Sequence, residues 1–156
     1  MMSTRDEIVV EARSWIPTPY IKRGMIKHVG TDCGMLPYMV MRKFNLVPDL
    51  GEDVPTFGDN WFCNTSDQGY ARVVERYWRR ILTGQCFRDG REEYRPGNIV
   101  LVRTYGSRVF NHAGIITKWP KVIHADPTCG VCETDVSTDL YWALKEIAVF
   151  DIGIEC

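Results

Sequence analysis

The pattern of hydrophobic and polar residues predicts a helix close to the N-terminus. Its apolar positions fall three or four residues apart, at Ile8, Ala12 and Trp15. Thr4 and Glu7 have the spacing of a capping box, in which each side chain accepts a hydrogen bond from the other residue's backbone. Because proline disrupts a helix interior, we expect this helix to end before Pro17.

A second helix is predicted after a turn-rich stretch that runs from Pro17 to Thr31. Proline is tolerated only in the first turn of a helix, so Pro37 requires this helix to begin at or just after Cys33. Its apolar face is expected to consist of Leu36, Met39, Val40 and Phe44.

Residues 46–64 contain prolines and glycines that interrupt any hydrophobic period, and they are predicted to form a long loop. A third helix is expected to begin with a capping box of Thr65 and Gln68. Its apolar stripe comprises Tyr70, Val73, Val74, Tyr77, Trp78, Ile81 and Leu82. The opposite face is rich in arginine, and we interpret it as a solvated face rather than as a partner surface.

From Pro96 onward the pattern changes to short apolar runs that are typical of strands. Strands are predicted at residues 99–102, 109–117, 121–126, 131–136 and 147–152, with a short helix at 139–145. Helices followed by strands favour an α+β fold, in which the helices pack on one antiparallel sheet. The length predicts a single domain over residues 1–156, with a helical insertion at about 46–96.

Composition and charge narrow the class of protein. A chain with 45% hydrophobic and 25% charged residues is neither a disordered tail nor a small disulfide scaffold. Its net charge of −1 argues against a nucleic-acid-binding protein. The N-terminus lacks the apolar core of a signal peptide, and no apolar run is long enough to span a membrane. We therefore expect synthesis in the cytoplasm without a signal peptide, and no membrane insertion.

Cys33 is the first candidate for chemistry, because it stands at the expected start of the second helix, in Gly30-Thr31-Asp32-Cys33-Gly34. A helix N-terminus carries a partial positive charge and free backbone amides. These are expected to lower the pKa of the Cys33 thiol and to hold a developing oxyanion. Gly34 would permit the close approach of a substrate carbonyl. Alone the signal is weak, since a free cysteine is usually a small buried hydrophobe.

Two of the three histidines strengthen this interpretation. His112 and His124 flank one predicted hairpin, and a register that pairs Ile115 with Lys121 places them opposite each other. Cysteine catalysis requires a base beside the thiol and a group that orients this base. Cys33, His112 and His124 can fill these three roles.

Motifs along the chain resemble those of the NlpC-type (NlpC/p60) family of papain-like cysteine peptidases, and within it the phage tail-associated subset. The resemblance covers about residues 7–152 and depends on the order of five short motifs. They are Trp15-Ile16-Pro17-Thr18-Pro19-Tyr20, Gly30-Thr31-Asp32-Cys33, Arg95-Pro96-Gly97-Asn98-Ile99-Val100, His112-Ala113-Gly114-Ile115 and Val122-Ile123-His124-Ala125. The family usually has other residues where this chain has Gly34, Pro37 and Asn98.

The resemblance implies a role for each site residue. Cys33 matches the nucleophile, His112 the general base and His124 the polar residue that orients the base. Tyr20 matches a tyrosine whose hydroxyl lies near the nucleophile and helps at the oxyanion, although a tyrosine after Pro19 can also simply pack. Asp32 is expected to shape the start of the helix.

The resemblance also implies a papain-like fold, a single catalytic domain and a reaction. The expected reaction is hydrolysis of peptidoglycan stem peptides at the bond between D-glutamate and a diamino acid, without a cofactor. The aromatic residues Phe57, Trp61 and Phe62 of the 46–64 loop are expected to form a wall of the substrate cleft. Phage tail proteins are expected partners, and a virion tail would carry the enzyme to the cell wall. Two alternatives remain open: a tail assembly component with a vestigial site, and an amidase or acyltransferase that uses the same cysteine and histidine.

The remaining cysteines include the pair Cys129 and Cys132, which has the spacing of half a zinc site. A structural zinc site needs four ligands, and Cys63, Cys86 or Cys156 would have to complete it. A disulfide or simple packing explains the pair with fewer requirements, so we expect no metal.

Overall fold

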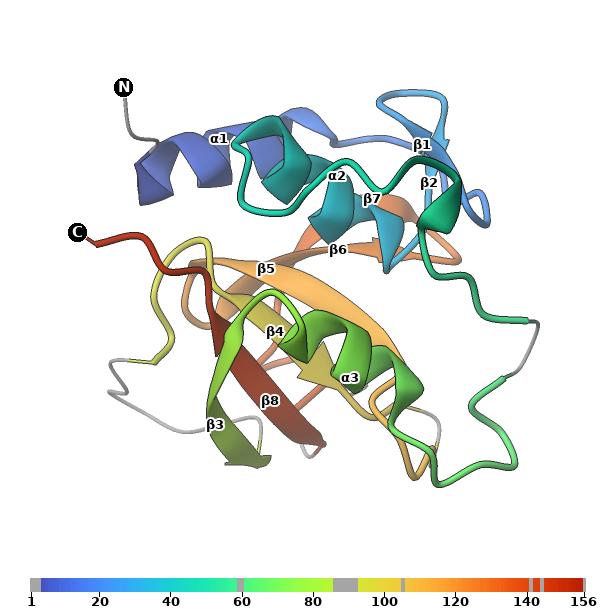
Figure 1. The fold of residues 1–156 in the computed structure, drawn as a ribbon. Helices are drawn as coiled ribbons and strands as arrows, with labels where there is room; N and C mark the ends of the chain where they lie inside the picture. The colour runs from blue at the N-terminus through green and yellow to red at the C-terminus, as the bar shows by residue number, and fades with distance from the viewer. Residues whose placement is uncertain are drawn as a thin grey trace.

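The apolar faces of two N-terminal helices pack on one face of an antiparallel sheet (Figure 1). The computed structural model describes residues 4–58, 61–85, 93–104, 106–140, 142–143 and 145–155. Helix α1 (Arg5–Ser14) begins with the predicted capping box of Thr4 and Glu7. Helix α2 (Met35–Lys43) begins after Gly34, which confirms the start that Pro37 requires. None of the helices in these residues is long and apolar enough to cross a membrane.

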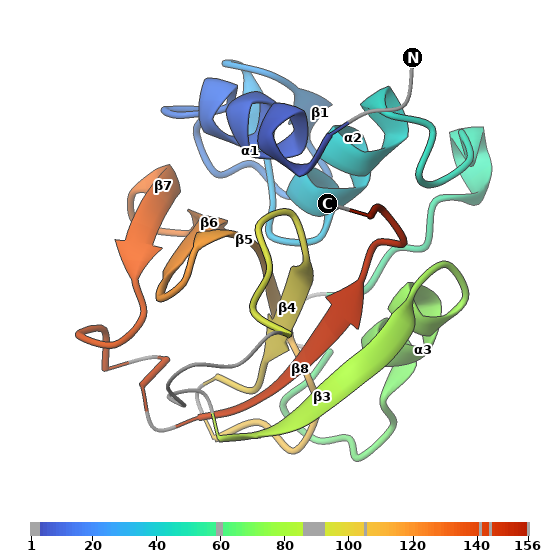
Figure 2. The same ribbon diagram turned by 90° about the vertical axis from the view of Figure 1, so that its left-hand side faces the viewer.

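The sheet contains six strands in the order β3-β8-β4-β5-β6-β7, and each neighbouring pair is antiparallel. The strands are β3 (Arg79–Gln85), β4 (Ile99–Val102), β5 (His112–Lys118), β6 (Lys121–Asp126), β7 (Gly130–Asp135) and β8 (Glu146–Asp151). Figure 2 shows them fanning from β7 to β3 below α1 and α2. The predicted α+β class is therefore confirmed.

Both faces of the central strands are buried. Ile99, Ala113 and Ile115 face the helices and join a core that includes Ile8, Leu36 and Val40. Side chains at alternate positions face the other way into a second core. Its members are Tyr94, Val100, Val102, Ile116, Val122, Val136, Trp142, Ile147 and Val149. Strands β4 and β5 thus lie between two apolar layers, which holds them in one register.

The predicted third helix is wrong beyond its first half. Helix α3 covers only Gly69–Glu75, and Arg79–Gln85 forms β3, which pairs with β8. The apolar residues of this segment also fit a helical stripe. Pairing with β8 supplies its backbone with hydrogen-bond partners, so tertiary context and not local propensity decides that it is a strand. The predicted capping box is also absent, because the Gln68 side chain bonds to the backbone of Arg108 and Phe110 instead.

Other differences concern short segments. Between Pro17 and Thr31 the chain forms a hairpin of two-residue strands, β1 (Met25–Ile26) and β2 (Gly30–Thr31), which are too short to show a period. A 3-10 helix, η1 (Gly51–Asp53), interrupts the long loop. The described residues of the 139–145 segment form hydrogen-bonded turns instead of the predicted helix. These turns bring Trp142 into the second core.

Arg5 connects the two ends of the chain with the start of β4. Its guanidinium donates to the carbonyl oxygens of Ile154 and Pro96, to Asn98 Oδ1 and to Asp151 Oδ1, at 2.8 to 3.0 Å. Only 6% of Arg5 is exposed. Since a buried charge is tolerated only with such partners, this cluster fixes α1 against the sheet.

We predict that Arg5→Ala lowers the free energy of unfolding by about 2–4 kcal/mol, because it leaves several acceptors without a donor. Urea denaturation followed by circular dichroism measures this change. The control is Arg42→Ala, which removes an exposed ion pair with Asp49 and should cost under about 1 kcal/mol. Equal losses in the two variants would contradict the role of Arg5.

Candidate active site

Asp32 fixes the backbone on both sides of Cys33. Its Oδ1 accepts hydrogen bonds from the amides of Gly34 and Met35 at 3.0 and 2.8 Å. Its Oδ2 accepts from the amide of Arg23, in the turn that precedes β1, at 2.7 Å. Asp32 therefore shapes the helix start, as predicted. The expectation of free amides at this helix start is wrong, because the Asp32 carboxylate already accepts the hydrogen bond of the Gly34 amide.

The Cys33 thiol is neutral at physiological pH. Burial and the charge of Asp32 raise its pKa to about 12, although hydrogen bonds from the Ala113 amide and the Tyr20 hydroxyl act in the opposite direction. The predicted lowering of this pKa is therefore wrong. The main physical reason is that burial disfavours the charged thiolate, and the negative charge of Asp32, which caps the helix, adds to this effect.

Tyr20 lies beside Cys33, as the motif predicts. An isolated β-bridge joins Tyr20 to Thr31, which places the tyrosine next to the segment that carries the thiol. The Tyr20 hydroxyl bonds to Cys33, and burial, followed by the charge of Cys33, raises the pKa of Tyr20. The hydroxyl therefore keeps its proton at neutral pH and acts as a donor.

His112 and His124 form a hydrogen-bonded pair, with His112 Nε2 lying 2.8 Å from His124 Nδ1. The predicted register is wrong by two residues, since Ile115 pairs with Ile123 and not with Lys121. The two histidines are consequently diagonal neighbours on β5 and β6. A Cβ at Gly114 would lie 2.3 Å from Val122 Cγ1, so only glycine at this position allows the strands to approach so closely.

Trp142 and Thr134 complete the surroundings of the histidines. The Trp142 ring lies 5.6 and 5.5 Å from the rings of His112 and His124, close to edge-on. Thr134 Oγ1 lies 2.8 Å from His124 Nε2. Burial, together with the nearby His124, lowers the pKa of His112 to about 3, and burial also lowers the pKa of His124. Both imidazoles are therefore neutral.

Sequence reasoning did not identify Thr134 or Trp142 as parts of the site. The β6–β7 register, which pairs Val122 with Thr134, would have suggested Thr134, because it fixes which β7 side chains face His124. Trp142 gave no comparable signal, since it stands in a segment without a strand or helix among its described residues.

The thiol and the histidines meet at the beginning of β5. The Cys33 thiol donates to the carbonyl oxygen of Asn111 at 4.0 Å and accepts from the Ala113 amide, so it touches the residues on each side of His112. Among the hydrogen bonds of the described residues, none joins the thiol to the His112 ring.

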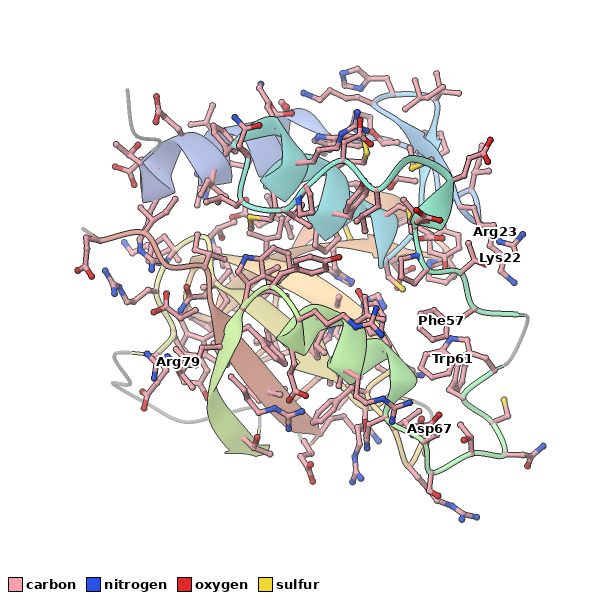
Figure 3. The ribbon with its side chains drawn as sticks, in the orientation of Figure 1. Lys22, Arg23, Phe57, Trp61, Asp67 and Arg79 are labelled. Carbon is pink, nitrogen blue, oxygen red and sulfur yellow. The ribbon has the colours of Figure 1, made fainter. Side chains whose placement is uncertain are left out.

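A cavity of about 410 Å³ opens in front of Cys33. Cys33, Tyr20 and Asn111 line it, whereas His112 is not among its lining residues. Phe57, Trp61 and Phe62 of the long loop also line this cavity. Figure 3 shows Lys22 and Arg23 across from Phe57 and Trp61 at the same end of the molecule. The cavity thus combines an aromatic wall with a cationic rim.

No group of three or more metal-ligating side chains occurs within the part of the chain that the structure describes. Cys86 and Cys156, named above as possible zinc ligands, lie outside the described residues. The predicted site residues supply a thiol, two imidazoles and a phenol.

Comparison with solved structures finds several with the same architecture. The NlpC/p60 domain of the peptidoglycan hydrolase SagA matches with a TM-score of 0.56 and 19% identity, over 94% of this chain and 98% of that domain. The chain has the NlpC/p60 fold. An N-acetylmuramoyl-L-alanine amidase from Bacteroides uniformis matches with a TM-score of 0.52 and 12% identity, over 94% of this chain and 98% of the amidase.

A longer NlpC/p60 family protein from Bacillus cereus matches with a TM-score of 0.59 and 14% identity. The match covers 95% of this chain but only 40% of the Bacillus protein. No family model matches the sequence, and no curated protein matches it either. The likeness to the NlpC/p60 fold is therefore one of structure.

The unusual residues of this chain fit the NlpC/p60 fold without distortion. Gly34 has ordinary helical dihedral angles, and a Cβ there would only contact Tyr70 and Asp32. Pro37 is the third residue of α2, where a missing amide breaks no helical hydrogen bond. Asn98 accepts from Arg5 and donates to the carbonyl of Glu93. None of these residues disturbs Cys33 or the histidines.

We predict that alkylation of Cys33 by iodoacetamide accelerates about tenfold per pH unit between pH 7 and pH 10, because its thiol pKa of about 12 leaves little thiolate. Peptide mapping by mass spectrometry follows the reaction at Cys33 alone. A rate that is already maximal at pH 7 would indicate a thiolate–imidazolium pair and contradict the neutral thiol.

Proposed function

We propose that the protein is a cysteine peptidase that hydrolyses peptidoglycan stem peptides. The observation that carries this proposal is the position of the Cys33 thiol, which lies beside the backbone that flanks His112, while His124 holds the ring of His112. The cavity in front of the thiol gives a peptide access. The solved structures with this fold include a peptidoglycan hydrolase and an N-acetylmuramoyl-L-alanine amidase, which supports the choice of substrate.

The hydrogen bonds assign a proton route. His112 Nε2 is held by His124, so Nδ1 is the nitrogen that takes the Cys33 proton as the sulfur attacks a peptide carbonyl. The resulting imidazolium donates from Nε2 to His124 Nδ1 and returns the first proton, from Nδ1, to the leaving amine. His112 then deprotonates a water molecule, which releases the acyl group from Cys33 as a carboxylic acid. In this step the ring must move closer to the thiol than it lies in the structure.

Tyr20 and the Cys33 amide are the proposed donors to the oxyanion. The Gly34 amide was the other candidate, but Asp32 accepts its hydrogen bond. The Tyr20 hydroxyl already reaches the sulfur, and its raised pKa keeps it protonated. A donor in this position stabilises the charge that develops on the carbonyl oxygen.

The cavity lining favours a substrate with carboxylates. Lys22 and Arg23 give the rim positive charge, and a stem peptide cut between D-glutamate and a diamino acid carries free carboxylates near the scissile bond. We propose this bond as the target. Delivery by a phage tail, with tail proteins as partners, would bring the enzyme from the cytoplasm to the cell wall.

An amidase is the second candidate, because the amidase from Bacteroides uniformis has the same fold. It would use the same thiol and histidines on the bond between the sugar and the peptide. Mass spectrometry of the products from defined muropeptides separates the two reactions, since only the amidase releases the complete stem peptide.

We predict that Cys33→Ala abolishes digestion of purified peptidoglycan, because Cys33 is the only thiol among the described residues that line the cavity. Release of soluble muropeptides, measured by chromatography, gives the rate. Cys63→Ala is the matched control, since Cys63 is an exposed free cysteine and its loss should leave the rate unchanged. Digestion by the Cys33 variant at the rate of the parent protein would end the proposal, and a parent protein that digests no wall material would favour the vestigial alternative.

We predict that Arg23→Gln and Lys22→Gln raise KM for a stem peptide about threefold to tenfold each and leave kcat nearly unchanged, because each removes a charge that binds the substrate before reaction. Arg79→Gln is the control, since Arg79 is 78% exposed and lies at the other end of the molecule (Figure 3). The same KM in all three variants would show that the cationic rim does not bind the substrate.

A further inference from the structure

Cys132 lies beside Nε2 of His124, the nitrogen that does not contact His112, and Cys129 lies beside Cys132. Cys132 on β7 pairs directly with His124 on β6, and Cys129 is in the turn that joins these strands. Their sulfur atoms are 3.3 Å apart. Cys132 Sγ is also 3.7 Å from both His124 Nε2 and Thr134 Oγ1. One thiol of the pair, Cys132, therefore contacts the group that orients the proposed base.

The geometry allows these thiols to form a disulfide without rearrangement of the sheet. A disulfide is about 2.05 Å long, so the two sulfurs must approach by about 1.3 Å. Cys132 is held by the β6–β7 ladder, whereas Cys129 is exposed in the turn. A small movement of the Cys129 side chain is sufficient.

We propose that Cys129 and Cys132 form a redox site whose oxidation state controls the tautomer of His124. This inference deepens the proposed function and rests on it for its effect on activity. The co-reactant is a low-molecular-weight disulfide. A Cys129 thiolate attacks it and releases one thiol, and the Cys132 thiolate then displaces the second thiol from the mixed disulfide. The protein loses two electrons and two protons, and the external disulfide becomes two thiols.

The consequence follows from the hydrogen bonds of His124. In the proton route above, His124 must accept at Nδ1, so its own proton must be on Nε2. The Cys132 thiol, while reduced, can donate to Nε2 and stabilises the opposite tautomer. That tautomer donates from Nδ1 to His112 Nε2 and leaves His112 unable to accept the Cys33 proton at Nδ1.

A disulfide sulfur has no proton to donate. Oxidation therefore removes the competing donor at His124 Nε2 and leaves Thr134 as its polar neighbour at 2.8 Å. The Thr134 hydroxyl can accept from Nε2, which favours the productive tautomer. The oxidised protein should consequently be the more active form. A metal ion is a poorer explanation of the pair, since the described residues contain no group of three ligands around it.

The first experiment tests disulfide formation in the Cys33→Ala protein, so that the nucleophile cannot react. After treatment with glutathione disulfide, we expect a mass loss of two hydrogen atoms and a proteolytic fragment in which Cys129 and Cys132 are linked. Partial desolvation of the Cys129 sulfur and the neighbouring Cys132 thiol raise the pKa of Cys129 to about 12, so the reaction should accelerate as the pH rises. Free thiols at both positions after prolonged treatment, or glutathione that persists on Cys129, would overturn the proposal.

The second experiment compares the rate of wall digestion in the reduced and the oxidised parent protein. Diamide serves as oxidant here, because it accepts two hydrogen atoms from a dithiol and leaves no glutathione on single thiols. We expect oxidation to raise kcat roughly twofold to tenfold, the range that one ordinary hydrogen bond supports, and to leave KM unchanged. Cys129→Ser should stay at the reduced rate under both conditions, and it corrects for any oxidation of Cys33.

Cys132→Val removes the thiol donor permanently, so it should have the high rate without oxidant. A Cys132→Val protein with the rate of the reduced parent would overturn the tautomer mechanism. The ¹⁵N chemical shifts of the His124 ring report the tautomer without any substrate. We expect them to shift towards the Nε2-protonated form on oxidation, even if the parent protein digests no wall material. Unchanged shifts in a fully oxidised protein would refute the control of His124.

Discussion

The site depends on the burial of β5 between two apolar layers. The helices cover one face of this strand, and Trp142 with its neighbours covers the other. Cys33 belongs to the helical layer, whereas the rings of His112 and His124 contact Trp142 in the opposite layer. The two halves of the site can meet only at the beginning of β5, where the strand no longer separates the layers. This requirement explains why the thiol touches Asn111 and Ala113.

Asp32 fixes the position of Cys33 and also helps to keep its thiol protonated, and therefore unreactive. Its carboxylate connects the turn before β1 with the first turn of α2, and so fixes the backbone of the nucleophile. The same negative charge raises the pKa of the thiol. A site with a neutral thiol and neutral imidazoles is spared the desolvation cost of a buried ion pair. Charge would then develop only when a substrate is present.

Much of the fold and the main members of the site follow from the sequence. Thr4 with Glu7 and Pro37 determine where α1 and α2 begin, because capping and proline act locally. The contact between His112 and His124 was predicted, but the strand register was not, because the hairpin turns at Trp119 and Pro120 and its pairing is irregular between Ile116 and Lys118. The β3 strand and the thiol pKa were also missed. Both depend on partners distant in sequence, β8 in one case and the burial by surrounding elements in the other.

One hydrogen bond at the edge of the sheet gives the site a mechanical property. The amide of Val131 on β7 donates to the carbonyl of Thr18, two residues before Tyr20. The segment with Tyr20 leads through the hairpin to Asp32 and α2, which pack on β5. Strands β5, β6 and β7 then return to Val131, so the contacts form a closed ring around the reactive groups. A ring of this kind resists shear better than an open chain of contacts, because no element can slide without straining its neighbours on both sides.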